Sequence, residues 1–237
     1  METLKIISIF KSVDGEAYHA GRPTIFLRTW GCNLRCAYPC DTRESWDMET
    51  YEKLYDHPLM ELTPGEARRQ IQELARGVRH VTITGGEPLL PENVPWMQEL
   101  CKLLLSDGFI IDIETNGAVP LANMAQWRST LPSPARVHFI MDWKCSGSKM
   151  LLKMLPENLG HLRTWDVVKC VVTDTDFPDV EAVRQRLSPE IPIYISPCFG
   201  NVTMNAIPEF VLEHSADNYV CQLQQHKYFW NPAKINI

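Results

Sequence analysis

Residues 23–42 read PTIFLRTWGCNLRCAYPCDT, a short apolar run followed directly by three cysteines. Residues 80–88 have a related arrangement, because the run HVTIT is followed at once by GGEP. Short runs of β-branched and apolar residues are typical of buried strands. Both stretches therefore predict a strand whose carboxyl end leads into residues that can carry chemistry.

The same strand pattern recurs along the chain, in FIIDIET (109–115), VHFIMDW (137–143), DVVKCVV (166–172) and IPIYIS (191–196). Helical patterns lie between these runs, at 63–77, 91–108 and 177–187. Alternating strands and helices predict a parallel sheet with crossover helices. Since about six strands are too few for an eight-unit barrel, we expect an α/β fold in the form of a partial TIM-type barrel.

The chain of 237 residues contains no repeat and no change of composition, so we expect a single domain over residues 1–237. Residues 43–60 are polar and aromatic and fit neither the strand period nor the helix period. We expect this segment to be an insertion or a lid.

The charge pattern excludes some classes of partner. The net charge is −6 and there is no long basic run, which argues against a nucleic-acid-binding surface. The first residues, METLKIISIF, are too short and too charged for a signal peptide, and no apolar run approaches the roughly 18 residues of a membrane span. We therefore expect a cytoplasmic protein without a membrane partner, in which clustered cysteines stay reduced and bind metal.

Unusual residues follow most of the predicted strands. In parallel sheets ligands bind outside the carboxyl ends of the strands, so we expect these segments to share one rim. Besides the cysteine loop they are Gly85–Pro88, Asn116–Gly117, Lys144–Ser146 and Ser196–Pro197.

Three closely spaced thiolates can hold three corners of a 4Fe–4S cluster and leave the fourth iron open. A structural zinc site would need a fourth ligand, and no histidine among His19, His57 and His80 has a compact spacing from the cysteines. A disulfide would leave one cysteine unpaired. The two glycines of GGEP let the backbone approach a ligand, although a tight turn would also explain them. The residues alone favour a cluster and leave zinc and coincidence open.

The sequence GCNLRC…C, followed one strand later by TGGEP, resembles the radical S-adenosylmethionine superfamily. More specifically, the chain is similar to the 7-carboxy-7-deazaguanine synthase family. The resemblance is carried by SVDGEAYHAGRPTIFLRTWGCNLRC, Cys-Asp-Thr at 40–42, Glu-Thr-Asn-Gly at 114–117, Asp-x-Lys at 142–144 and His226-Lys227.

The resemblance implies a lyase that converts 6-carboxy-5,6,7,8-tetrahydropterin to 7-carboxy-7-deazaguanine with loss of ammonia, a step toward queuosine-type nucleosides. It implies a 4Fe–4S cluster, S-adenosylmethionine and Mg²⁺ as cofactors. It also implies a flavodoxin- or ferredoxin-type reductant and a homodimer.

The resemblance assigns roles residue by residue. The metal ligands are Cys32, Cys36 and Cys40 for the cluster and Thr42 for magnesium. The residues near S-adenosylmethionine are Tyr38, Pro39, Asp41, Gly85, Gly86, Glu87, Lys144, Cys145 and Ser146. The substrate residues are Val13, Asp14, Gly15, Glu16, Arg28, Thr84, Glu114, His226 and Pro232. The last two imply that the C-terminal segment 220–237 closes the pocket.

The chain departs from the family pattern at three places. The spacing Cys-x3-Cys-x3-Cys has one residue more than usual, Asp14 stands where the family tends to have glutamine, and five residues follow Pro232.

Two alternatives remain: a glycyl-radical activase that acts on a protein partner, and a non-enzymatic zinc-binding module. The N-terminal element VDGE at 13–16, which precedes the strand that carries Arg28, and His226 favour a small-molecule substrate.

Overall fold

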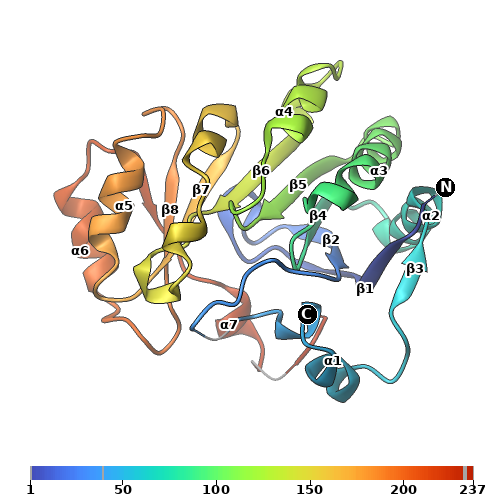
Figure 1. The fold of residues 1–237 in the computed structure, drawn as a ribbon, viewed down its shortest axis with the longest axis horizontal. Helices are drawn as coiled ribbons and strands as arrows, with labels where there is room; N and C mark the ends of the chain where they lie inside the picture. The colour runs from blue at the N-terminus through green and yellow to red at the C-terminus, as the bar shows by residue number, and fades with distance from the viewer. Residues whose placement is uncertain (1, 39, 232–233, 237) are drawn as a thin grey trace.

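The computed structural model describes residues 2–38, 40–231 and 234–236, and within them the strands form one sheet in the order β3-β1-β2-β4-β5-β6-β7-β8-β9 (Figure 1). The strands are β1 Leu4–Val13, β2 Pro23–Thr29, β3 Met60–Leu62, β4 His80–Gly85, β5 Ile110–Thr115, β6 Val137–Asp142, β7 Val167–Val172, β8 Ile193–Pro197 and β9 Tyr219–Cys221. Strands β2 and β4 to β9 are parallel, and β1 is antiparallel to both β2 and β3.

The predicted α/β fold with a mostly parallel sheet is confirmed, and the six predicted strands are β2 and β4 to β8. The count of strands was too low, because β1, β3 and β9 were missed. Lys5 and Lys11 interrupt the apolar pattern of β1, and both are exposed on this antiparallel strand. Strands β3 and β9 have only three residues each, which is too short for a period to be recognised.

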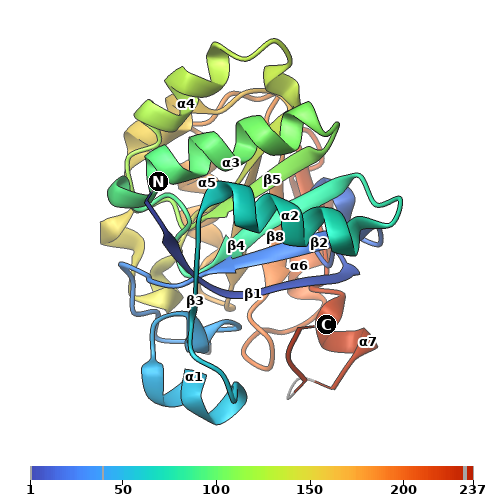
Figure 2. The same cartoon turned by 90° about the vertical axis from the view of Figure 1, so that its right-hand side faces the viewer.

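Seven α-helices are present in the described part of the chain: α1 Met48–Leu54, α2 Pro64–Ala75, α3 Val94–Ser106, α4 Ala122–Ser129, α5 Phe177–Arg184, α6 Ala206–Glu213 and α7 His226–Phe229. Helix α2 begins where predicted, because Thr63 and Glu66 form a capping box. Helices α2 to α6 lie along the sheet, whereas α1 and α7 both lie below it in the two views, apart from each other (Figures 1 and 2). None of the described helices has the length and apolarity needed to span a membrane.

Side chains alternate between the two faces of each parallel strand. On β4 and β5, Val81, Ile83, Ile111 and Ile113 are fully buried in the main hydrophobic core, which includes Leu100 of α3. The intervening residues are polar and point to the opposite side, which we call the inner face.

The polar residues of the inner face form two layers. The rim layer comprises Arg28, Thr84, Glu114 and Asp142, which lie toward the carboxyl ends of their strands, and Lys169, which is paired in register with Asp142. The base layer comprises His80, Thr82, Asp112 and His138, which lie toward their amino ends. The cysteine loop follows β2 and therefore lies on the side of the rim layer.

Candidate active site

The cysteine loop is anchored to its surroundings at several points. Gly31 donates its backbone N–H to the carbonyl of Ser45 at 2.7 Å, and Ala37 donates to the carbonyl of Ser148 at 2.9 Å. Leu34 is buried in the main core. The fixed backbone therefore presents the cysteine side chains from a defined position.

The three cysteine thiols are free and close enough to influence one another. Cys32 and Cys36 are half-buried and Cys40 is exposed. Burial raises the pKa of both Cys32 and Cys36, the charge of Cys40 raises each further, and Lys144 opposes the rise at Cys36. The N–H of Leu34 lies 3.4 Å from the Cys32 sulfur. Three free thiols with an N–H donor at one sulfur form a donor set that suits a 4Fe–4S cluster.

The histidines considered as a fourth zinc ligand lie elsewhere. His19 and His80 contact Asp112 in the base layer, at 2.9 and 3.1 Å. His57 lies beside Tyr51, with its Nδ1 3.5 Å from the phenol oxygen. Among the described residues, none of the three makes a contact with the cysteine loop, so a zinc site built from the cysteines and one of these three histidines has no support.

The two glycines of GGEP let the end of β4 pack against the cysteine loop. A Cβ atom on Gly86 would lie 1.9 Å from the carbonyl oxygen of Gly31, and one on Gly85 would lie 2.5 Å from the backbone of Thr29. Gly85 also has a φ of +113°, a conformation that favours glycine. The N–H of Glu87 donates to the Gly31 carbonyl at 2.7 Å. The glycines thus hold the start of the cysteine loop against β4.

Glu87 joins the loops that follow β4 and β5. Its buried carboxylate accepts hydrogen bonds from the Thr115 hydroxyl at 2.9 Å, the Asn116 N–H at 2.6 Å and the Leu89 N–H at 2.9 Å. Burial raises the pKa of Glu87 to about 7, although these hydrogen bonds oppose the rise. Asn116 in turn places its amide nitrogen 3.8 Å from the Cys32 sulfur. Glu87 therefore helps to position the surroundings of the first cysteine.

The residues after Cys40 connect the loop to β4 and to the C-terminal segment. The Thr42 hydroxyl donates to the Gly85 carbonyl at 2.8 Å. Asp41 pairs with Lys227 at 2.9 Å and with His226 at 3.7 Å. Burial acts to raise the pKa of Asp41, but His226 and Lys227 outweigh it and hold that pKa well below its usual range. The α7 region is therefore held electrostatically against the end of the cysteine loop.

The rim layer contains a network of buried charges. Lys169 contacts the carboxylate of Glu16 and lies 3.7 Å from Asp142 Oδ1. Burial acts to lower the pKa of Lys169, but Asp142, Glu16 and Glu114 raise it well above its ordinary value. Glu114 accepts a hydrogen bond from the Thr84 hydroxyl at 2.5 Å. The network combines cations and acceptors on one face, as a polar ligand requires.

Three buried polar atoms at this site have no hydrogen-bond partner in the protein: Arg28 Nε, Tyr38 Oη and Asp142 Oδ1. Arg28 is otherwise held by Glu44 at 3.7 Å and by the ring of Phe10 at 4.9 Å. Buried polar atoms are normally paired, so unpaired ones that gather at one site indicate where ligand groups bind.

Comparison with known proteins agrees with this geometry. The sequence pattern of the radical SAM superfamily matches residues 27–131. The 7-carboxy-7-deazaguanine synthase of Clostridium acetobutylicum is 36% identical over 98% of this chain and 99% of its own length. The chain belongs to the 7-carboxy-7-deazaguanine synthase family. The family member from Methanospirillum hungatei is 34% identical over 97% of this chain and 86% of its own length.

A solved structure shares the fold. The crystal structure of QueE from Escherichia coli superposes with a TM-score of 0.64 at 22% identity and covers 93% of both chains. At this identity the likeness concerns the fold. Membership of the radical SAM superfamily implies a 4Fe–4S cluster and S-adenosylmethionine as cofactors.

Several residues that the family resemblance assigns to the site lie where direct side-chain contact is restricted. The thiol of Cys145 is fully buried in the main core beside Cys170, so only the backbone of Cys145 remains available to a cofactor. Lys144 pairs with Asp142 at 2.8 Å, and the N–H of Ser146 bonds to Asp179 at 2.7 Å.

The connection after β1 carries the other predicted substrate residues. Val13 ends β1, and a Cβ on Gly15 would lie 2.7 Å from His226 Nδ1, so Gly15 allows α7 to approach. Asp14 bonds to the Thr82 hydroxyl at 2.9 Å and so faces the base layer. Pro39 and Pro232 lie outside the described residues.

Lys169 and Gln224 received no role from the sequence, yet both contact Glu16. Gln224 donates its amide to Glu16 at 2.7 Å and lies 3.2 Å from Asp41. Lys169 could have been found from the sequence, because it is a charged residue inside the apolar run DVVKCVV. Gln224 offered no such signal, because its segment has no periodic pattern.

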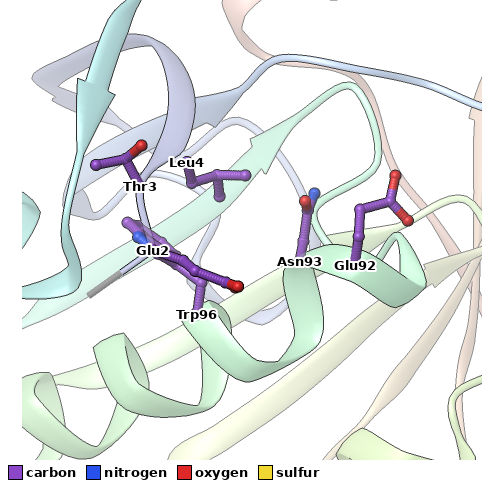
Figure 3. A pocket seen from close by; sticks show the side chains of 6 residues that line it. All are labelled: Glu2, Thr3, Leu4, Glu92, Asn93 and Trp96. Atoms are coloured by element: carbon purple, nitrogen blue, oxygen red, sulfur yellow. The ribbon is translucent and has the colours of Figure 1, made fainter.

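A surface hollow lies apart from these residues (Figure 3). It is lined by Glu2, Thr3, Leu4, Glu92, Asn93 and Trp96, from the start of β1 and the start of α3. The lining contains no cysteine and no cationic side chain to bind the carboxylate of S-adenosylmethionine. The hollow is therefore not the cofactor site.

Proposed function

We propose that this protein converts 6-carboxy-5,6,7,8-tetrahydropterin to 7-carboxy-7-deazaguanine with loss of ammonia. The observation that carries the proposal is the position of a free three-thiol loop on the same side of the sheet as the rim layer, whose Arg28 and Asp142 have unpaired buried atoms. The family membership supplies the reaction class.

In this proposal Cys32, Cys36 and Cys40 hold the 4Fe–4S cluster. When bound, the cluster and S-adenosylmethionine would supply, with one electron from the reductant, the radical chemistry that acts at C6 of the pterin. The protein's own contribution is to position and shield the reacting groups. Gly85 and Gly86 hold the cysteine loop against β4, and Tyr38 offers a half-buried ring for the adenine.

The rim layer would bind the pterin. The guanidinium of Arg28 can pair with the substrate carboxylate, because its planar donors match carboxylate geometry. Glu16 and Glu114 would accept hydrogen bonds from pterin N–H groups. Lys169 lies against Glu16 and holds it in place, so the acceptor is oriented before substrate arrives.

Magnesium is proposed to bind next to Thr42. The Thr42 hydroxyl uses its proton to bond Gly85, which leaves its oxygen lone pairs available to a cation. A hard ion that keeps waters and substrate oxygens around it needs few protein ligands.

We also propose that the sheet is a partial TIM-type barrel within one domain over residues 1–237, and that segments 43–60 and 220–237 close its pocket. Support comes from contacts between the two segments. Tyr55 donates its hydroxyl to Asn236 at 3.2 Å, and Ile235 packs against the cluster formed by Tyr51, Tyr55 and Ile7. The reductant, the homodimer and the cytoplasmic location stay predictions.

The deciding experiment is anaerobic turnover with S-adenosylmethionine, a reductant and 6-carboxytetrahydropterin, followed by mass spectrometry. We expect 7-carboxy-7-deazaguanine and 5′-deoxyadenosine to form together, and product to decrease when magnesium is omitted. Formation of 5′-deoxyadenosine only with a glycyl-loop protein partner would instead support an activase.

A further inference from the structure

A second group of potential metal ligands lies in the base layer, at the opposite end of the strands from the cysteines. One ligand atom each from His19, His80 and Asp112 lies within 4.8 Å of the other two. Asp112 Oδ2 is 2.9 Å from His19 Nδ1 and 3.1 Å from His80 Nε2. The three residues come from the 3-10 helix Ala17–His19, from β4 and from β5.

His80 is the independent sign of a ligand. Its side chain is only 8% exposed, yet neither ring nitrogen has a hydrogen-bond partner in the protein. The imidazole stacks at a tilt on the ring of His19, with 4.0 Å between ring centroids. Leaving a buried polar group unpaired costs about 1–3 kcal/mol, so a second group is expected to satisfy it.

Pairing of histidines with Asp112 explains only part of the cluster. The Nδ1–H groups of His19 and His138 can each donate to Asp112, at 2.9 and 2.7 Å. His80 is left out of that arrangement, because its contact with Asp112 lacks hydrogen-bond geometry. A cation between the three side chains would give His80 a role.

We propose that His19, His80 and Asp112 bind a divalent transition-metal ion, for which zinc is the best candidate. Two imidazoles and one carboxylate suit zinc better than magnesium or calcium, which prefer oxygen ligands. In a tetrahedral zinc site with ordinary bond lengths, neighbouring ligand atoms are about 3.3 Å apart. The two observed separations from Asp112 Oδ2 are close to this value.

The surrounding residues would support the ligands. His138 bonds Asp112 Oδ1 at 2.7 Å and the Ala135 carbonyl at 2.9 Å, so it orients the carboxylate and leaves Oδ2 for the metal. His80 Nδ1 lies 3.9 Å from Asp14 Oδ2, and a small closure would let it donate there. Carboxylates commonly orient metal-bound histidines in this way. The partly exposed His19 leaves a side on which a water can complete the coordination.

The site would position the connection between β1 and β2. That connection carries His19 and also Asp14 and Glu16, and the metal would tie it to β4 and β5. This consequence for Glu16 depends on the proposed function, whereas metal binding itself does not.

The test begins with metal analysis of the anaerobically purified, cluster-containing protein. We expect about one zinc per chain in addition to the cluster iron. In the variant with Cys32→Ala, Cys36→Ala and Cys40→Ala, iron should be lost and zinc retained. If zinc is lost in that variant, it was bound by the cysteine loop and the proposal is wrong.

Single substitutions then assign the ligands. His80→Gln and His19→Gln should each reduce zinc affinity by more than the roughly 10- to 100-fold that loss of an outer-shell partner costs. His214→Gln serves as the matched control, because His214 pairs with Glu181 on α5, away from the base layer, and zinc should be unchanged. Cobalt(II) should give visible absorption bands in the variant that lacks the three loop cysteines, and the bands should disappear with His80→Gln. His19→Gln changes a partly exposed residue, so it remains informative if His80→Gln does not fold.

Folded protein that takes up neither zinc nor cobalt would overturn the proposal. Zinc content is measured without pterin turnover, so failure of either proposal can be recognised separately. A protein that contains zinc but forms no 7-carboxy-7-deazaguanine would refute only the proposed function.

Discussion

The rim layer and the base layer lie on the same strands but differ in how their charges are satisfied. On β5, Glu114 of the rim layer and Asp112 of the base layer are only two residues apart, a rise of about 7 Å. The rim layer leaves Arg28 Nε and Asp142 Oδ1 without hydrogen-bond partners in the protein. In the base layer Asp112 contacts three histidines. We therefore expect the rim layer to recognise a ligand. We expect the base layer to join the connection after β1 to strands β4, β5 and β6.

The pKa values reflect the same difference. Burial acts to raise the pKa of Asp112, but His138, His19 and His80 outweigh it and hold the pKa well below its usual range. In the rim layer, burial raises the pKa of Glu114, and Glu16 adds to the rise while Lys169 opposes it. The base carboxylate is therefore matched by its neighbours, whereas Glu16 and Glu114 compete for Lys169 and Asp142 also pairs with Lys144. A ligand with N–H donors would relieve that competition.

The largest effect is expected at the edge of the rim, where Cys40→Ala removes a cluster ligand. Turnover should decrease at least about a thousandfold, because the radical cannot form without the cluster. Iron content and the brown colour should decrease in parallel. Cys221→Ala, which changes another exposed cysteine, is the control and should keep both. An intact chromophore in Cys40→Ala would show that Cys40 is not a cluster ligand. The rim layer would then no longer be set apart from the base layer by a neighbouring cluster.

The next effect concerns the pH dependence of stability. Burial raises the pKa of Glu87 from 4.5 to about 7, so between these values the folded protein keeps a proton that the unfolded chain loses. The unfolding free energy should therefore decrease as pH rises through this window, by about 3 kcal/mol in total. Glu87→Gln should lack this component of the decrease. Urea unfolding of both proteins at about pH 5 and about pH 7.5 measures it, and parallel profiles would contradict the expectation.

A smaller effect, confined to catalysis, is expected for Arg28→Lys in the rim layer. Loss of the planar fork should lower kcat/KM for the carboxypterin about 10- to 100-fold. The unfolding free energy should change by less than about 1 kcal/mol, since the positive charge near Glu44 is retained. Steady-state kinetics and urea unfolding measure the two quantities. Equal losses of stability and activity would show that the rim layer is structural.

The smallest effect on turnover is expected for Asp112→Asn in the base layer. The unfolding free energy should fall by about 1–2 kcal/mol, because two histidines lose a charged acceptor. The kcat should fall by less than about threefold even if the proposed metal is lost, because Lys169 and Gln224 still hold Glu16. Thermal unfolding and single-turnover kinetics measure these quantities. A loss of kcat/KM as large as that expected for Arg28→Lys would mean that the base layer contributes to catalysis as much as the rim layer does.

Much of the rim could be predicted from sequence because its groups follow strands directly. Strand period and strand–helix alternation identify β2 and β4 to β8, and the carboxyl ends of parallel strands meet at one edge. The loops that begin at Gly31 and Gly85 were placed together on this basis, and the structure brings them into contact. The side-chain partners of Glu87 were not predictable, because three donors on separate segments converge on it.

The amino-acid sequence by itself determined the strand–helix alternation, the spacing of the three cysteines and the family, because all of these are local or covalent properties. Only the tertiary structure decided that His19 and His80 meet Asp112 and that Lys169 meets Glu16. His19 and Asp112 are 93 residues apart, and Glu16 and Lys169 are 153 apart. Contacts over such separations depend on strand order and register, which are set by packing of the whole sheet and leave no local pattern in the chain.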